Sequence, residues 1–326
     1  MIYIYNKITN PYFNLATEEY ILKEFKDECF MLWRNEPSII VGKNQNTLAE
    51  INLDYVKEHN IPVVRRLSGG GAVFHDLGNV NFTFIVNDDL NGFSDFRRFT
   101  QPIIDVLKKL SINAEFSGRN DITIDGKKIS GNAQYYYKNR ILHHGTLLVS
   151  SNMTDLSAAL KVRPMKFEDK GVKSVSKRVT NINEHLKEPI GIEEFINLIM
   201  NDIRERTGGS GLYEFTDEDI KNIEKLKNEK YSTWEWNFGM SPDYNLKNEK
   251  KFLGGTLEVD LNVSDGIIKD IKIYGDFFGK KDVKEIEDIL KGVRHSESDV
   301  REALSFVDIN EYFANISLEN LIDVLF

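Results

Sequence analysis

Three consecutive glycines between two expected strands constrain this chain more than any other feature of its sequence. They lie in residues 65–76, after a strand around Val63 and before a strand at residues 81–86. Glycine lets backbone amides approach a bound anion closely, and Arg66 adds a forked guanidinium. The segment therefore predicts a cradle for phosphate or an adenylate. The alternative is a glycine-rich turn whose arginines are solvated.

The same segment argues against two common nucleotide-binding folds. It matches neither GxxxxGK[ST] nor GxGxxG, and a strand follows it where those motifs require a long helix. No helix N-terminus is evident for the phosphates, so loop amides and cationic side chains must supply the contacts. We therefore expect neither a P-loop nor a Rossmann fold.

Composition indicates a globular protein. The chain has 326 residues, of which 41% are hydrophobic and 29% charged, with no run of eighteen apolar residues. Its net charge of -9 argues against nucleic-acid binding as the main activity. The single cysteine, Cys29, excludes an intrachain disulfide and any CxxC site. We expect a cytoplasmic protein without a membrane span.

Strand and helix signals divide the chain into a large and a small domain. Strand signals dominate residues 65–150, which predicts a mixed or antiparallel sheet, and helix signals include residues 192–206 and 217–227. A polar run at residues 245–251 precedes two further strands and two helices. We predict domains at residues 1–245 and 246–326.

A lysine beside a tight turn is the leading catalytic candidate. Asp125-Gly126 is a hairpin signal, and Lys128 follows it, with small residues after it. Such a lysine can hold its ammonium over a narrow pocket, where it meets a carboxylate and a phosphate oxygen. A solvated hairpin lysine is the alternative. Asp121 is expected to orient Lys128 or a metal, or to cap a turn.

Histidines and a basic run are weaker candidates. His143 and His144 lie in one strand and point to opposite faces, so only one of them can line a site. With His75 they lack the spacing of a zinc site, and hydrogen-bonded strand packing is the alternative. Residues 161–178 hold seven basic residues, which suit a polyanionic nucleotide or an acidic partner unless they are simply solvated.

Taken together, the segments resemble the lipoate-protein ligase A family of the biotin and lipoate ligase superfamily. The resemblance spans the whole chain, because Trp234 to Gly239 and the residues after 246 resemble the family's domain junction and C-terminal domain. Its motifs lie in residues 65–79, 118–121, 128–133, 143–148 and 174–181. Their order and co-occurrence are far more specific than any one motif alone.

The resemblance implies an α+β fold. The large domain would be biotin/lipoate-ligase-like, with mixed and antiparallel sheets flanked by helices, and the small C-terminal accessory domain would be α/β. Residues 174–181 would close over the adenylate. The nucleotide would be held by Arg66, Gly71, Ala72, Val73, Phe74 and Lys128. Lipoate would be held by Lys128, Gly70 and His144, with Asp121 as a possible metal or orienting residue.

The implied reaction uses Mg²⁺ and ATP. Lipoate would attack the α-phosphate to give lipoyl-AMP and pyrophosphate, and a lysine of a lipoyl carrier domain would then take the acyl group. The family suggests glycine cleavage H protein or acyltransferase subunits of 2-oxo acid dehydrogenases as partners, and we expect a monomer. An octanoyl or lipoyl transferase that uses an enzyme cysteine, and a non-catalytic acyl-binding protein, are the alternatives.

Overall fold

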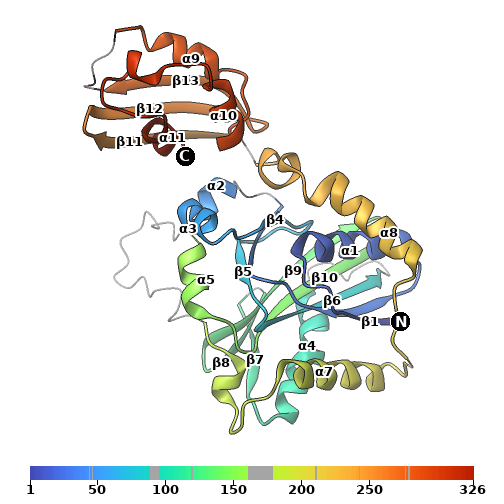
Figure 1. The fold of residues 1–326 in the computed structure, drawn as a ribbon. Coiled ribbons are helices and arrows are strands. Elements are labelled where there is room, and N and C mark those ends of the chain that lie inside the picture. The colour runs from blue at the N-terminus through green and yellow to red at the C-terminus, as the bar shows by residue number, and fades with distance from the viewer. Residues whose placement is uncertain are drawn as a thin grey trace. The chain divides into compact units, whose positions relative to one another are not determined.

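The chain divides into two compact units in the computed structural model (Figure 1). The structure describes residues 1–43, 45, 47–88, 95–118, 120–160, 179–209, 211–241, 243–275, 277 and 280–326. The large unit comprises residues 1–43 and 50–233, and the small unit comprises residues 44–49 and 234–326. The functional division at residue 246 stays a prediction.

A seven-stranded mixed sheet forms the centre of the large unit, with strand order β1-β2-β6-β10-β9-β8-β7. Only β1 and β2 pair in parallel, and the other neighbours are antiparallel. The expectation of a mixed sheet is confirmed. The strands are β1 (Ile2–Asn6), β2 (Cys29–Trp33), β6 (Asn79–Asn87), β7 (Ala114–Ser117), β8 (Asp121–Ile124), β9 (Lys127–Tyr137) and β10 (Arg140–Leu148).

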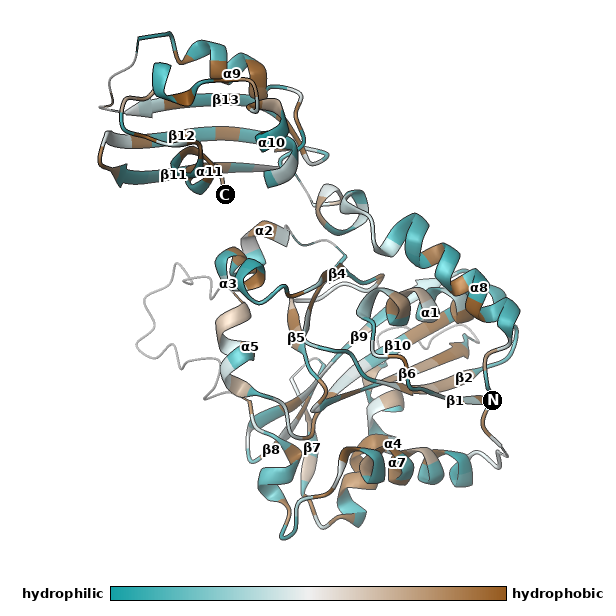
Figure 2. Cartoon of the chain, in the orientation of Figure 1, coloured by the Kyte–Doolittle hydropathy of each residue, from teal (hydrophilic) through white to brown (hydrophobic). Residues whose placement is uncertain are grey.

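Helices cover both faces of this sheet. Helices α4 (Phe96–Lys109) and α7 (Ile192–Arg206) bury their apolar side chains in the core beneath it, whereas α1 (Pro11–Glu24) and α8 (Asp217–Leu226) lie on the other face (Figure 1). Figure 2 shows hydrophobic residues along the sheet strands and a mostly hydrophilic α8. Unlike α8, α1 buries ten of its fourteen residues, among them Glu18 and Glu19. Two adjacent buried carboxylates need partners, which this unit supplies.

A second, three-stranded sheet carries the glycine segment. Its order is β4-β3-β5, with β4 parallel and β5 antiparallel to the central strand. The strands are β3 (Ser38–Val41), β4 (Val63–Arg65) and β5 (Val73–His75). Because β3 lies between β4 and β5, the segment that joins those two strands must cross the end of β3.

Short helices complete the large unit. They are α3 (Leu53–Glu58), α5 (Met153–Ala159), the 3₁₀ turn η1 (Ile182–His185) and the π-helical turn η2 (Lys227–Tyr231). Asn52 and Asn152 cap α3 and α5 with their side chains, as polar residues at this position commonly do.

The small unit is an antiparallel sheet with helices against one face. Along β12 buried and less buried residues alternate, so one face forms the core of this unit. Asp265 and Gly266, both with positive φ, turn β12 into β13. Its elements are most of α2 (Thr47–Glu50), whose last residue belongs to the large unit, and η3 (Glu235–Gly239), β11 (Tyr244–Phe252), β12 (Gly255–Ser264), β13 (Ile267–Gly275), α9 (Lys284–Leu290), α10 (Glu297–Ala303), η4 (Ile309–Glu311) and α11 (Leu318–Leu325).

Candidate functional site

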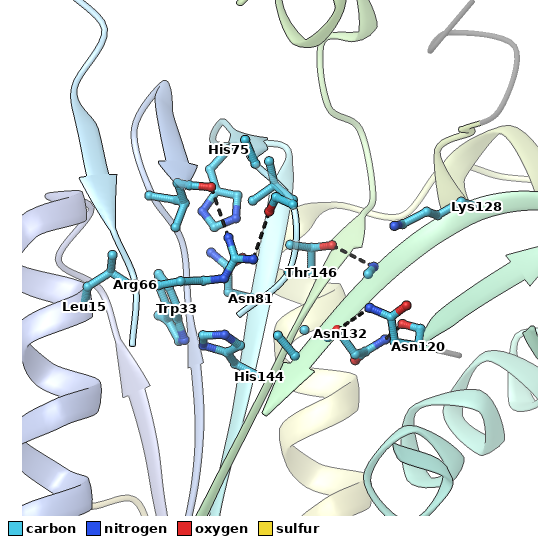
Figure 3. A pocket seen from close by; sticks show the side chains of 18 residues that line it. Leu15, Trp33, Arg66, His75, Asn81, Asn120, Lys128, Asn132, His144 and Thr146 are labelled. Atoms are coloured by element: carbon cyan, nitrogen blue, oxygen red, sulfur yellow. Dashed lines mark hydrogen bonds between the residues drawn. The ribbon is translucent and has the colours of Figure 1, made fainter. Parts of the chain in front are cut away.

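A pocket opens between the two sheets of the large unit (Figure 3). It holds about 650 Å³ of space, its open mouth included. The walls combine apolar side chains, glycine backbone and a few polar groups. They are formed by Leu15, Trp33, Ile40, Arg66, Gly70, Gly71, Ala72, Val73, His75, Asn81, Asn120, Lys128, Gly131, Asn132, Ala133, His144, Gly145 and Thr146.

The glycine loop arches over the end of β3 and forms one wall. Lys43 N donates to Ser68 O at 2.9 Å, which ties the loop to the chain just beyond β3. A Cβ on Gly42 would overlap the carbonyl oxygen of Gly70, so the close approach requires glycine there. Gly70 has φ +98°, and Gly70 and Gly71 are exposed. The exposed backbone of Gly70 and Gly71 is therefore accessible to a ligand.

Arg66 is buried beneath this loop and holds its shape. Its guanidinium donates to Ile40 O at 3.1 Å, Gly69 O at 2.7 Å and Gly71 O at 2.8 Å, and its Nε donates to Ser68 Oγ at 3.0 Å. Burial lowers the pKa of Arg66 to about 10, which leaves it charged at neutral pH. The loop therefore carries a fixed positive charge behind its amides, which favours an anion in front of them.

A chain of three side chains continues from Arg66 into α1. Ser68 Oγ lies 2.6 Å from His144 Nε2, and His144 Nδ1 lies 3.0 Å from both carboxylate oxygens of Glu18. A carboxylate only accepts, so Nδ1 carries a proton and donates it to Glu18. All three side chains are buried. This series of hydrogen bonds fixes the orientation of His144 in the pocket wall.

Lys128 stands at the start of β9, as the hairpin signal predicts. Asp125 and Gly126 have φ of +48° and +74° and form the turn between β8 and β9. Lys128 Nζ is 2.8 Å from Asp121 Oδ1, and both side chains are about one-third exposed. A Cβ on Gly131 would lie 2.8 Å from that ammonium, so the lysine can fold over the strand only because residue 131 is glycine.

The structure brings most of the predicted site residues together. Arg66, Gly70, Gly71, Ala72, Val73, Lys128 and His144 all lie on the pocket wall. Phe74 does not: it alternates with Val73 and His75 along β5, and its side chain is buried away from the pocket. Asp121 does not line the pocket either, but it pairs with Lys128, which does.

The two adjacent histidines divide as expected. His143 lies on the core face of β10, stacked against Phe99 with ring centroids 4.6 Å apart, and Gln134 contacts its Nδ1 at 3.1 Å. Burial holds the pKa of His143 well below its usual value. His144, on the opposite face, reaches the pocket. Strand alternation therefore lets only one of the two histidines line the site, as predicted.

Metal ligation receives no support from the protein side chains alone. Within the described ranges, no group of three or more His, Cys, Asp or Glu side chains could hold an ion.

In the same residues, no helix is long and apolar enough to cross a membrane. The basic run at residues 161–178 lies outside the described residues. Of the loop expected at residues 174–181, the described end lies beside the site, because Thr180 N donates to Lys128 O at 3.0 Å.

Sequence reasoning missed several residues of the site. Glu18 and Trp33 come from the N-terminal part of the chain, for which the sequence predicted no site residue. Asn132 lies in the motif at residues 128–133, but the sequence predicted no role for its side chain. The one available signal for Glu18 was an acidic pair within an apolar helix, which a chain would avoid unless both carboxylates had partners. His75 lines the pocket, although the sequence suggested only a zinc role for it.

Comparisons with known proteins identify a family that the chain resembles along most of its length. Residues 10–204 match the model of the lipoyl protein ligase A/B catalytic domain, and residues 241–325 match that of the bacterial lipoate protein ligase C-terminus. Lipoate-protein ligase 1 of Staphylococcus aureus is 49% identical over 98% of both chains.

Two solved structures are also similar. A bi-partite lipoate protein ligase of Thermoplasma acidophilum, described with its E2 lipoyl domain, is 33% identical and covers 73% of this chain and 96% of its own, with a TM-score of 0.66. A lipoate-protein ligase A bound with ATP is 30% identical, covers 73% of this chain and 98% of its own, and has a TM-score of 0.65.

Proposed function

The chain belongs to the lipoyl protein ligase A/B family, and from that premise we propose that it is an ATP-dependent lipoate-protein ligase. It would activate lipoate as lipoyl-AMP and transfer the acyl group to a lysine of a lipoyl carrier domain. The observation that carries the proposal is the pocket itself. One wall is the exposed backbone of Gly70 and Gly71 over the buried charge of Arg66, and Lys128 stands across from it.

In the first half-reaction a lipoate carboxylate oxygen attacks the α-phosphorus of ATP, and pyrophosphate leaves. Lys128 would contact both the carboxylate and the α-phosphate, and Asp121 would hold its ammonium in place. The amides around Gly71, Ala72, Val73 and Phe74 would face the nucleotide, with Arg66 acting through the loop it supports. The apolar chain of lipoate would lie against Trp33 and Ile40.

In the second half-reaction the ε-amine of the carrier lysine attacks the acyl carbonyl, and AMP leaves. Both nucleophiles come from substrates, so the chain contributes mainly position and electrostatic stabilisation. Mg²⁺ would accompany the phosphates of ATP, which suits an ion that usually takes one or two carboxylates and several waters or phosphate oxygens. Asp121, which pairs with Lys128, is the carboxylate we propose for such a role.

The carrier is proposed as a lipoyl domain, because the Thermoplasma acidophilum ligase is described with its E2 lipoyl domain. Glycine cleavage H protein and the acyltransferase subunits of 2-oxo acid dehydrogenases are the two candidate classes. We also propose that the chain acts in the cytoplasm as a monomer.

The buried position of Cys29 argues against the rival cysteine transferase. Its side chain is 1% exposed within β2, and burial raises the pKa of its thiol to about 12. A transferase nucleophile must ionise and reach its substrate, and this thiol does neither. The second alternative, a non-catalytic acyl-binding protein, would not cleave ATP.

Exchange of labelled pyrophosphate into ATP tests the proposal directly. The ligase reaction predicts exchange that depends on lipoate and needs no carrier, because lipoyl-AMP formation is reversible. Transfer of an acyl group to a lipoyl domain without ATP would contradict it and favour the transferase. Lipoate binding with no exchange would favour the binding protein.

A further inference from the structure

His75 lines the pocket, and one of its ring nitrogens has no hydrogen-bond partner among the described residues. Its ring is 4% exposed and lies on the pocket wall, beside Trp33 with ring centroids 6.1 Å apart (Figure 3). Its Nδ1 is 3.1 Å from the side-chain nitrogen of Asn35. Among the residues that the structure describes, Nε2 has no hydrogen-bond partner. A buried polar atom of this kind points to a ligand atom as its partner.

A chain of buried amides determines which ring nitrogen of His75 carries the proton. The Nδ2 of Asn14 donates to the backbone carbonyls of Ile8 and Arg34, both at 2.8 Å, and this fixes the orientation of the Asn14 amide. The same nitrogen lies 2.8 Å from the Asn35 side chain, and two amide nitrogens would repel at that distance. Asn35 therefore presents Oδ1 to Asn14 and its Nδ2 to His75. An amide nitrogen only donates. Nδ1 of His75 therefore accepts, and the hydrogen sits on Nε2.

The ring also stays neutral, so its role does not depend on charge. Burial, with Arg66 and His144 nearby, lowers the pKa of His75 to about 3. At neutral pH the ring is a single-donor group on the pocket wall. Asn14 and Asn35 are both fully buried, which keeps water from competing for Nδ1.

The donor lies away from the catalytic end of the pocket. In Figure 3, Lys128 and Thr146 lie on one side, whereas His75, Trp33 and Leu15 lie on the other. A ligand whose carboxylate meets Lys128 therefore directs its apolar tail toward His75. The tail meets apolar side chains there, together with this one N–H.

Building on the proposed ligase function, we propose that His75 Nε2–H donates to a sulfur atom of the dithiolane ring and so selects lipoate over octanoate. A ring sulfur is a weak acceptor, whereas the methyl end of octanoate accepts nothing. An octanoate tail in the same place would leave a buried donor unpaired, and that costs binding free energy. Methylene count cannot make this distinction, because both acids have eight carbons in the chain.

Two variants of His75 separate a donor from a space-filling role. The readout is selectivity, the ratio of kcat/KM for lipoate to kcat/KM for octanoate. His75→Phe keeps a ring without the donor, and we expect its selectivity to fall about fivefold. His75→Gln restores an N–H at a similar reach and should recover most of the selectivity. Equal losses for both acids in His75→Phe, or no recovery in His75→Gln, would overturn the proposal.

A measurement on the unmodified protein removes any dependence on how the variants fold. With ¹⁵N-labelled histidine, long-range ¹H–¹⁵N spectra should show His75 with its proton on Nε2, and free lipoate should shift that resonance more than octanoate does. A proton on Nδ1, or equal shifts with both acids, would overturn the inference. Binding of the free acids needs no ATP, so failure of the ligase function would appear separately, as absent pyrophosphate exchange.

Discussion

The pocket and the core of the small unit bury very different side chains. Around the pocket, Glu18, Arg66 and His144 are buried, and hydrogen bonds through Ser68 join them. The small unit instead buries aliphatic and aromatic residues such as Val259 and Phe313. Burying polar groups costs free energy unless every group is paired. The contrast indicates that the pocket is built for chemistry and the small-unit core for stability.

The largest expected effect lies in the small unit. Phe313 is fully buried and packs edge-on against Phe277, with centroids 4.8 Å apart. Phe313→Ala should lower the free energy of unfolding of this unit by about 3 to 5 kcal/mol. Hydrogen exchange should accelerate in β12 and α11 but not in β9 or β10. Phe306, which is 99% exposed, supplies the control. Phe306→Ala should change neither the free energy of unfolding of this unit nor its hydrogen-exchange rates.

The next effect is on catalysis rather than stability. Lys128→Ala should reduce lipoate-dependent pyrophosphate exchange by about 10²- to 10³-fold, because the ammonium would neutralise charge on carboxylate and phosphate. The side chain is partly exposed, so thermal unfolding should stay nearly unchanged. Lys127→Ala removes an exposed charge one residue away and should retain activity. Near-normal exchange by Lys128→Ala would remove this lysine from the mechanism.

Gly131→Ala gives a smaller effect through the same lysine. The new methyl group would lie 2.8 Å from Lys128 Nζ, and the flexible side chain would move to avoid it. We expect about a tenfold loss of exchange, or ~1.4 kcal/mol, with little change in stability. Gly191→Ala is the matched control, since a Cβ there meets nothing within 4 Å. If both variants behave alike, the position of the ammonium is not critical.

Cys29→Ser should have the smallest effect on activity. The thiol is buried in β2 and does not line the pocket, so exchange should stay within about twofold of the unmodified protein. Stability should fall by about 1 to 3 kcal/mol, because a hydroxyl replaces a thiol in an apolar site. A tenfold activity loss in a variant that circular dichroism shows to be folded would revive the thioester route.

Local sequence signals predicted the parts of the site that depend on neighbours in the chain. The turn at Asp125-Gly126 followed from its dipeptide, and the opposite faces of His143 and His144 followed from strand alternation. Both features depend on backbone geometry that a few residues determine.

Contacts between distant residues could not be predicted in this way. Glu18 meets His144 across 126 positions, and Asn35 meets His75 across 40. Such pairs depend on sheet order and register, which follow from the packing of the whole unit. The placement of β3 between β4 and β5 belongs to the same class, and it determines that the glycine loop arches over a strand end.

Mass spectrometry of a purified apo lipoyl domain tests the central claim most directly. The domain is incubated with this protein, lipoate and Mg-ATP, and matched reactions omit ATP or replace it with an analogue whose bridge between the α- and β-phosphates cannot be cleaved. The ligase account predicts one lipoyl group on the carrier lysine, with one AMP formed per group, and no modification in either matched reaction. Modification without ATP, or AMP formation with an unmodified carrier, would contradict it.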